Sequence, residues 1–243
     1  MMVKPLLIAL QFLTRIPLPS HPHLEPRDIG RSMLFYPLVG LLIGSLLYGI
    51  EHLLQGAAPL LRAALLVATW VVITGALHLD GLADMADGWI GGHGDRERTL
   101  TIMKDPYCGP MGVTALLLVL LLKVAALEQI AGQATYVLLV APLLGRTFLL
   151  LLLLTTPYVR PGGLGETLSR ELPRTVAWVI VVAVSVGLVL IPGISVAMLF
   201  VMLGVFLLFR YVLLARLGGT TGDTAGALLE VCEVAVLIYT ALL

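Results

Sequence analysis

The chain has 243 residues, of which 59% are apolar and 12% charged, and its formal net charge at pH 7 is zero. Soluble domains carry about 25% charged residues, and a chain of this size cannot hide so much apolar surface from water, so lipid must solvate much of it. Zero net charge and the lack of any Lys/Arg run exclude attraction to nucleic acid. We therefore predict a single integral membrane domain over residues 1–243.

Apolar segments long enough to cross a bilayer recur along the chain. A spanning helix needs about 20 mostly apolar residues, and seven segments fit: Met33–Leu54, Leu61–Leu79, Gly112–Ile130, Thr135–Thr156, Thr175–Ile191, Ser195–Leu214 and Ala225–Leu243. Pro5–Leu13 is too short and stops before two prolines, which indicates an interfacial or re-entrant helix. The expected fold is an all-α, polytopic transmembrane helix bundle of about seven spans. Because the last segment is short and carries two acids, six spans plus a half-buried helix is the alternative.

Basic residues gather in alternate loops. One set of loops holds nearly all of them, whereas the other set holds Arg62 and almost nothing else. The first set comprises Lys4, Arg15, Arg27, Arg31, Arg96, Arg98, Lys104, Arg160, Arg170, Arg174, Arg210 and Arg216. Positive charge in short loops marks the cytoplasmic side. We therefore expect a multi-pass membrane protein with its N-terminus and its acidic residues facing the cytoplasm and its C-terminus outside.

The densest acidic group follows the second predicted span. Asp80, Asp84 and Asp87 stand at i, i+4 and i+7, so on a helix that continues this span they fall within an arc of about 60°. Three carboxylates on one stripe repel one another, and a divalent cation resolves the repulsion. Oxygen ligands at this spacing suit Mg²⁺ or Mn²⁺, completed by substrate phosphate. Gly81 and Ala83 leave room for a neighbouring helix or a bulky ligand. The alternative is a solvated helix end.

A turn-rich loop separates this acidic group from the third span. Lys104 and Arg98 are candidate phosphate contacts, and the alternative for each is ordinary cytoplasmic positive charge. Asp105 is a candidate metal ligand or general base, and the alternative is a turn-initiating aspartate before Pro106.

A glycine-rich loop leads into the last predicted span. Such a loop presents backbone N–H groups and the positive end of a helix dipole to an anion, while Asp223 has an alternative role as an N-cap. Glu230 and Glu233 lie within an apolar helix, where ionisable groups are functional candidates. Their alternative role is to pair with Arg146 or Lys123 inside the bundle.

Four motifs in chain order resemble the cobalamin synthase family, the adenosylcobinamide-GDP ribazoletransferases. They are Phe12–Pro17, then His78–Asp84 with Asp87 and Gly88, then Ile102–Asp105 with Gly109 and Gly112, and finally Gly218–Gly219 with Thr221–Thr224, Gly226 and Glu230. They extend from one end of the chain to the other, and the length fits as well.

The resemblance implies a Mg²⁺-dependent transferase in a bacterial cytoplasmic (inner) membrane, with its active site facing the cytoplasm. It would join adenosylcobinamide-GDP to α-ribazole, or to its 5′-phosphate, and release GMP. The implied metal ligands are Asp80, Asp84 and Asp87, the catalytic residues Lys104, Asp105 and Asp223, and the substrate-binding residues Arg15, His78, Arg98, Gly219, Thr221, Gly222, Glu230 and Glu233. Partners would be the bilayer, a second copy of the chain, and other cobalamin assembly enzymes.

Two other functions fit parts of the pattern. Asp84-x-x-Asp87-Gly88 also resembles part of the CDP-alcohol phosphotransferase motif, but no Ala-Arg follows Gly88 at the expected place. An ion-coupled transporter would also carry intramembrane acids. Transporters, however, commonly show internal repeats and polar groups near the midplane, whereas these acids cluster toward one face and the sequence has no convincing repeat.

Overall fold

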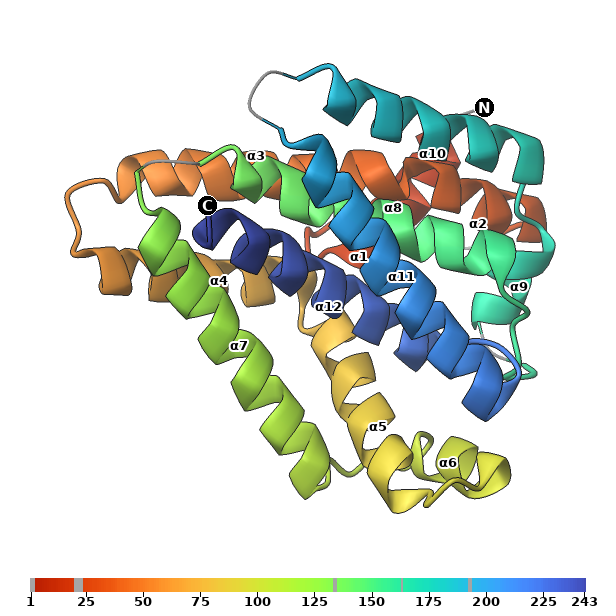
Figure 1. Ribbon diagram of the computed structural model, residues 1–243. Helices are drawn as coiled ribbons and strands as arrows, with labels where there is room; N and C mark the ends of the chain where they lie inside the picture. The colour runs from red at the N-terminus through yellow and green to blue at the C-terminus, as the bar shows by residue number, and fades with distance from the viewer. Residues whose placement is uncertain (1–2, 20–23, 133–134, 163, 192–193) are drawn as a thin grey trace.

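The described part of the chain consists of helices joined by short non-helical segments. A computed structural model describes residues 3–19, 24–132, 135–162, 164–191 and 194–243. The elements are α1 (Val3–Leu13), α2 (Pro26–Ser32), the 3₁₀ helix η1 (Met33–Phe35), α3 (Tyr36–Leu53), α4 (Pro59–Thr74), α5 (Leu77–Gly91), α6 (Arg96–Ile102), α7 (Pro110–Ile130), α8 (Val137–Thr155), α9 (Leu164–Arg170), α10 (Arg174–Val189), α11 (Val196–Leu217) and α12 (Gly222–Ala241) (Figure 1). The predicted all-α class is confirmed.

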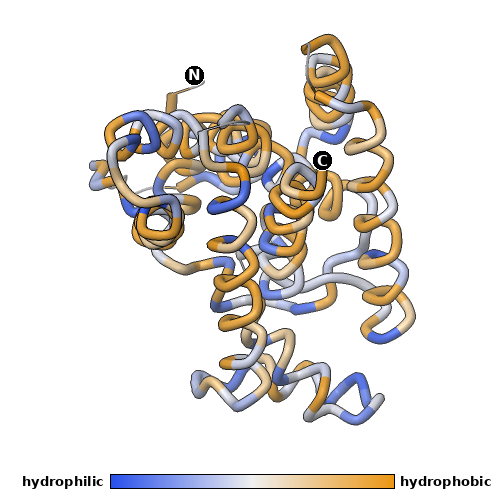
Figure 2. Tube along the Cα trace, turned by 60° about the vertical axis from the view of Figure 1, so that its left-hand side comes forward, coloured by the Kyte–Doolittle hydropathy of each residue, from blue (hydrophilic) through white to orange (hydrophobic). Residues whose placement is uncertain are grey.

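Each predicted span contains a helix, but fewer helices than expected reach spanning length. Within the described residues, five are long and apolar enough to cross a membrane: Pro26–Leu53, α7, α8, α11 and α12. A sixth is obtained if the bent pair α4–α5 counts as one span, whereas α10 has only 16 residues. The count is therefore five or six rather than seven. Figure 2 shows that these long helices are mostly hydrophobic along their length.

Helix α8 forms the centre of the bundle and is buried along almost its whole length, packing against α3 and α12. Two glycines of α3 allow this contact. A Cβ atom on Gly40 would lie 2.4 Å from the carbonyl oxygen of Pro142, and one on Gly44 would lie 2.6 Å from that of Leu138. Helices α7 and α11, in contrast, keep much of their apolar surface exposed, as lipid-facing helices do.

The second predicted span does not continue into the acidic segment. Helix α4 ends at Thr74, and α5 starts again at Leu77 with a 91° change of direction. Gly75 and Ala76 make the bend with φ values of 63° and 58°, a conformation that costs little for glycine and more for alanine. The backbone N–H of Arg15 donates to the carbonyl of Ile73 at 2.7 Å, and its side chain lies against Gly75. The expectation of one continuous helix was therefore wrong, although the aspartates do share the helix α5.

Candidate active site

Helices α5 and α12 cross with their backbones almost in contact. A Cβ atom on Gly81 would lie 2.8 Å from the carbonyl oxygen of Asp223, and one on Gly226 would lie 3.2 Å from the Cα atom of His78. Small residues at a helix crossing permit this approach, and the expectation that Gly81 makes room for a neighbouring helix is confirmed. The crossing brings Asp80 and Asp84 close enough to the α12 carboxylate for electrostatic interaction.

A cavity of about 230 Å³ opens at this crossing. Its polar wall comes from α5, from the start of α12 and from the loop after α8, and it comprises His78, Asp80, Gly222, Asp223, Tyr158 and Arg160. Its apolar wall comes largely from α1, α3, α8 and α9, and it includes Phe12, Tyr36, Leu149, Leu153 and Leu168. An apolar cavity with a few converging polar groups is the usual form of a small-molecule site.

Arg160 supplies a cation to this cavity. Its guanidinium donates to the Asp223 carboxylate at 2.7 Å, and the two side chains are 28% and 18% exposed. The sequence suggested for Arg160 only a place among the cytoplasmic positive charges. Its position directly after a span, beside Pro161 and Gly162, was the available signal.

Backbone hydrogen bonds fix the loop that carries Arg160. Thr220 donates its N–H to the Pro157 carbonyl at 2.8 Å, and Val159 donates to the Thr220 carbonyl at 2.9 Å. A Cβ atom on Gly219 would lie 2.3 Å from that Pro157 oxygen, so Gly219 permits this pairing. Partial burial raises the pKa of Tyr158, so its phenol keeps its proton and stays a donor at the cavity.

The predicted stripe of three aspartates divides in two. The carboxylates of Asp80 and Asp84 accept no hydrogen bond from any described residue, whereas Asp87 accepts three backbone N–H bonds at the start of α7. Among the described residues, no group of three or more His, Cys, Asp or Glu side chains is arranged to hold a metal ion. The oxygens that stay free for a cation are therefore those of Asp80 and Asp84.

Glu230 and Glu233 lie in the bundle core, away from the cavity wall. Lys123 of α7 donates to Glu230 at 2.7 Å and to Glu233 at 2.6 Å, and Arg146 of α8 also pairs with Glu233. All four side chains are buried, and the Lys123 ammonium lies 4.4 Å from the centre of the Trp70 ring. The structure thus shows the alternative that the sequence left open, pairing with both Arg146 and Lys123.

His78 occupies the boundary between the cavity and this buried core. It is 3% exposed and lines the cavity. Neither of its ring nitrogens has a hydrogen-bond partner among the described residues. Because buried polar groups are normally paired, His78 remains a candidate substrate contact.

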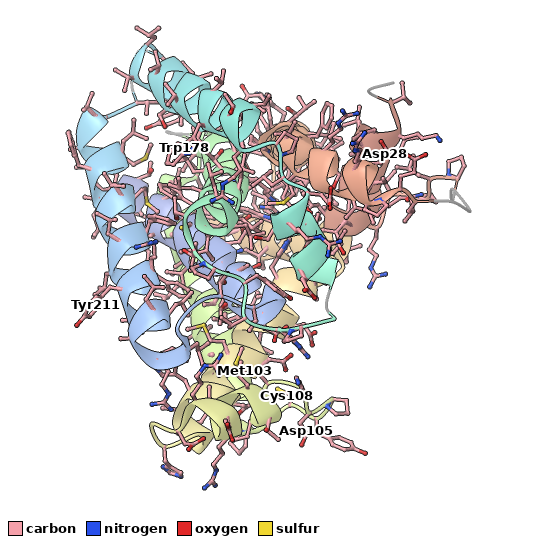
Figure 3. The ribbon with its side chains drawn as sticks, turned by 90° about the vertical axis from the view of Figure 1, so that its right-hand side faces the viewer. Asp28, Met103, Asp105, Cys108, Trp178 and Tyr211 are labelled. Atoms are coloured by element: carbon pink, nitrogen blue, oxygen red, sulfur yellow. The ribbon has the colours of Figure 1, made fainter. Side chains whose placement is uncertain are left out.

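The remaining predicted site residues lie outside the cavity wall. Lys104, Arg98 and Asp105 are exposed, and Asp105 accepts the backbone N–H of Tyr107 at 3.1 Å, which is its alternative turn role. Figure 3 shows Asp105 at the lower end of the molecule, pointing outward. Thr221 caps α12 through a reciprocal pair of bonds with Thr224, and Arg15 covers the α4–α5 bend.

Comparison with known proteins agrees with the resemblance read from the motifs. The model of the family described as cobalamin-5-phosphate synthase matches residues 5–241. A relative from Pseudomonas paraeruginosa, named adenosylcobinamide-GDP ribazoletransferase, is 56% identical over 243 residues, covering 99% of this chain and 98% of its own. One from Pseudomonas putida with the same name is 57% identical over 242 residues, covering 98% of both chains. No solved structure matches. The chain therefore belongs to the cobalamin-5-phosphate synthase family of transferases.

Proposed function

We propose that the protein joins adenosylcobinamide-GDP to α-ribazole, or to its 5′-phosphate, and releases GMP, at a site on the cytoplasmic face of a bacterial inner membrane. The relatives' name supports the reaction. The observation that carries it is one cavity lined by Asp80, whose carboxylate accepts no hydrogen bond from the described residues, and by the Arg160–Asp223 ion pair. Asp84 lies close enough to interact electrostatically with Asp80 and Asp223. Phosphoryl transfer needs this combination, a place for cations and a cationic side chain for the phosphates.

The reaction balances as one substitution at phosphorus. A ribose hydroxyl oxygen of the ribazole forms a bond to the phosphorus on the cobinamide side of the diphosphate, and the bond to the GMP oxygen breaks. Arg160 donates N–H bonds to the phosphate oxygens, which suit its planar fork. Asp223, once released from Arg160, accepts the hydroxyl proton. Asp223 is better placed for this role than Asp105, because it lines the cavity.

The residues present fit a hard divalent cation. Mg²⁺ commonly takes one or two protein carboxylates and completes its shell with waters and substrate phosphates. The free oxygens of Asp80 and Asp84 provide such a pair. When bound, the ion supplies positive charge that neutralises the diphosphate and the departing phosphate.

The test of this function is direct. Purified protein in detergent or vesicles is incubated with Mg²⁺, adenosylcobinamide-GDP and either α-ribazole or its 5′-phosphate, and the joined product and GMP are followed by mass spectrometry. The proposal is supported if the joined product and GMP form in equal amounts and if one of the two acceptors is used in preference to the other. A protein that folds in the membrane and yields neither product with either acceptor contradicts it.

Chelation is expected to stop the reaction. EDTA in excess over metal removes the ion that Asp80 and Asp84 are proposed to hold, and the negative cavity then repels the diphosphate. GMP release should fall to background and return when Mg²⁺ exceeds the chelator, while EDTA already saturated with Mg²⁺ serves as the control. Full activity in excess chelator would exclude the metal role.

Arg160→Gln is expected to lower kcat/KM for adenosylcobinamide-GDP by about 10- to 100-fold, the scale of a lost hydrogen bond to a charged group. The matched control is Arg170→Gln on α9, because Arg170 is exposed and, among the described residues, its ion pair is with its neighbour Glu171. Steady-state kinetics with the diphosphate substrate varied measure the effect. Equal kcat/KM values for the two variants would remove Arg160 from the site.

A further inference from the structure

The Asp87 side chain extends from α5 to the first turn of α7. Its Oδ2 accepts the N–H of Gly109 at 2.7 Å, and its Oδ1 accepts those of Met111 and Gly112 at 3.1 and 2.9 Å. The first N–H groups of a helix have no partner within the helix. Gly109, the N-cap residue of α7, has no side chain to cap them. A carboxylate from another helix therefore caps α7.

Two glycines make room for this carboxylate. A Cβ atom on Gly109 would lie 2.6 Å from Oδ1 of Asp87, and one on Gly112 would lie 2.5 Å from Oδ2. Atoms this close cannot coexist, so any larger residue at either position pushes the carboxylate out of its cradle. Two glycines of the third motif and one aspartate of the second thus form a single structural unit, the Asp87 cradle.

The hydrogen bonds of the cradle occupy most of the lone pairs with which the Asp87 carboxylate could bind a cation. A carboxylate has about four lone-pair sites, and three of those of Asp87 already accept N–H bonds. The negative charge also lies at the positive end of the α7 dipole, where it is stabilised. Asp80 and Asp84, on the same helix, accept no hydrogen bond from the described part of the chain.

We propose that Asp87 is a positioning residue rather than a ligand of the metal: it ties α5 to the start of α7 and so holds Asp80 and Asp84 against α12. Helix α7 binds both helices of the site, since its Lys123 pairs with Glu230 and Glu233 of α12. The effect on catalysis rests on the proposed function, whereas the tie between α5 and α7 does not.

The cradle is tested without any substrate by amide hydrogen exchange. The full-length protein in detergent is compared with Asp87→Ala, Asp87→Asn and Gly109→Ala, and exchange is read over peptides that contain residues 109–112. Loss of the cap should speed exchange there about fivefold, the scale of a missing helix cap. Asp87→Asn, which keeps an acceptor oxygen, should fall between the parent and Asp87→Ala. Unchanged exchange in Asp87→Ala would overturn the tie.

Gly109→Ala separates positioning from metal binding, because it keeps every carboxylate and breaks only the cradle. Gly109→Ala and Asp87→Ala should both lower kcat about 10- to 100-fold, with the half-saturating Mg²⁺ concentration unchanged. A raised Mg²⁺ requirement in Asp87→Ala alone would make Asp87 a ligand. Full activity in a Gly109→Ala variant with fast exchange would also overturn the proposal. If the unmodified protein makes no product, the proposed function is wrong. The hydrogen-exchange comparison would still show whether Asp87 ties α5 to α7.

Discussion

Asp84→Asn should reduce product formation by at least about 100-fold, the scale of losing one preorganised electrostatic group at a reacting centre. Asp84 lies on α5 between Asp80 and Asp87, interacts electrostatically with Asp223, and accepts no hydrogen bond from the described residues. An amide keeps the size of the side chain and removes the charge that would bind the cation. The assay is product formation by purified protein in detergent or vesicles at saturating Mg²⁺.

The control for this prediction is Asp28→Asn. Asp28 lies on α2, away from the site cavity, and Figure 3 shows it far from Asp105 and Cys108. Both variants should insert in the membrane and elute from size exclusion like the parent, and only Asp84→Asn should lose activity. If Asp84→Asn makes product at the parental rate with Mg²⁺ present, the site assignment fails.

Lys123→Met should have the largest effect on stability. Among the described residues, the substitution leaves buried Glu230 without its ion-pair partner and buried Glu233 with Arg146 alone. Removing one partner from a buried ion pair typically costs about 3–5 kcal/mol. Thermal unfolding in detergent, followed by loss of helical circular dichroism, should show a clearly lower Tm than that of the parent.

The matched variant for this prediction adds Glu230→Gln to Lys123→Met. The double variant removes one positive and one negative charge, so the remaining pair of Arg146 and Glu233 balances itself. Its Tm should therefore lie between those of the single variant and the parent. A single variant as stable as the parent would show that these charges do not hold the bundle together.

Composition and periodicity were enough to predict the fold class and the helical segments, but not the bend between α4 and α5. Long apolar runs predict helices in contact with lipid, and this prediction does not depend on how the helices pack against one another. The bend depends on Ala76 adopting a positive φ, which sequence patterns do not predict because alanine rarely does so. Tertiary contacts at the bend, among them the Arg15 side chain over Gly75, are visible only in the folded chain.

The site was predictable only in part, for similar reasons. Helical spacing placed Asp80 and Asp84 on one helix, and Gly81 indicated a close neighbour. The direction in which Asp87 points could not be predicted, because its partners lie 22 to 25 residues further along the chain. Arg160 was missed because its one signal, a position directly after a span and beside Pro161 and Gly162, does not by itself distinguish a pocket cation from an ordinary loop charge. The choice between substrate contact and ion pair for Glu230 depended on how α7 and α12 pack.

The buried quartet of Lys123, Arg146, Glu230 and Glu233 has a consequence for the bilayer itself. Its ammonium, its guanidinium and its two carboxylates carry charges that sum to zero, and they are paired with one another. A proton or metal ion that enters the acidic cavity therefore finds, within this quartet, no unmatched charge that could carry it further. Separating the pairs costs several kcal/mol. We expect vesicles that contain the protein to hold a pH gradient as well as empty ones, so that the cell keeps its membrane potential while cation-dependent chemistry runs at one surface.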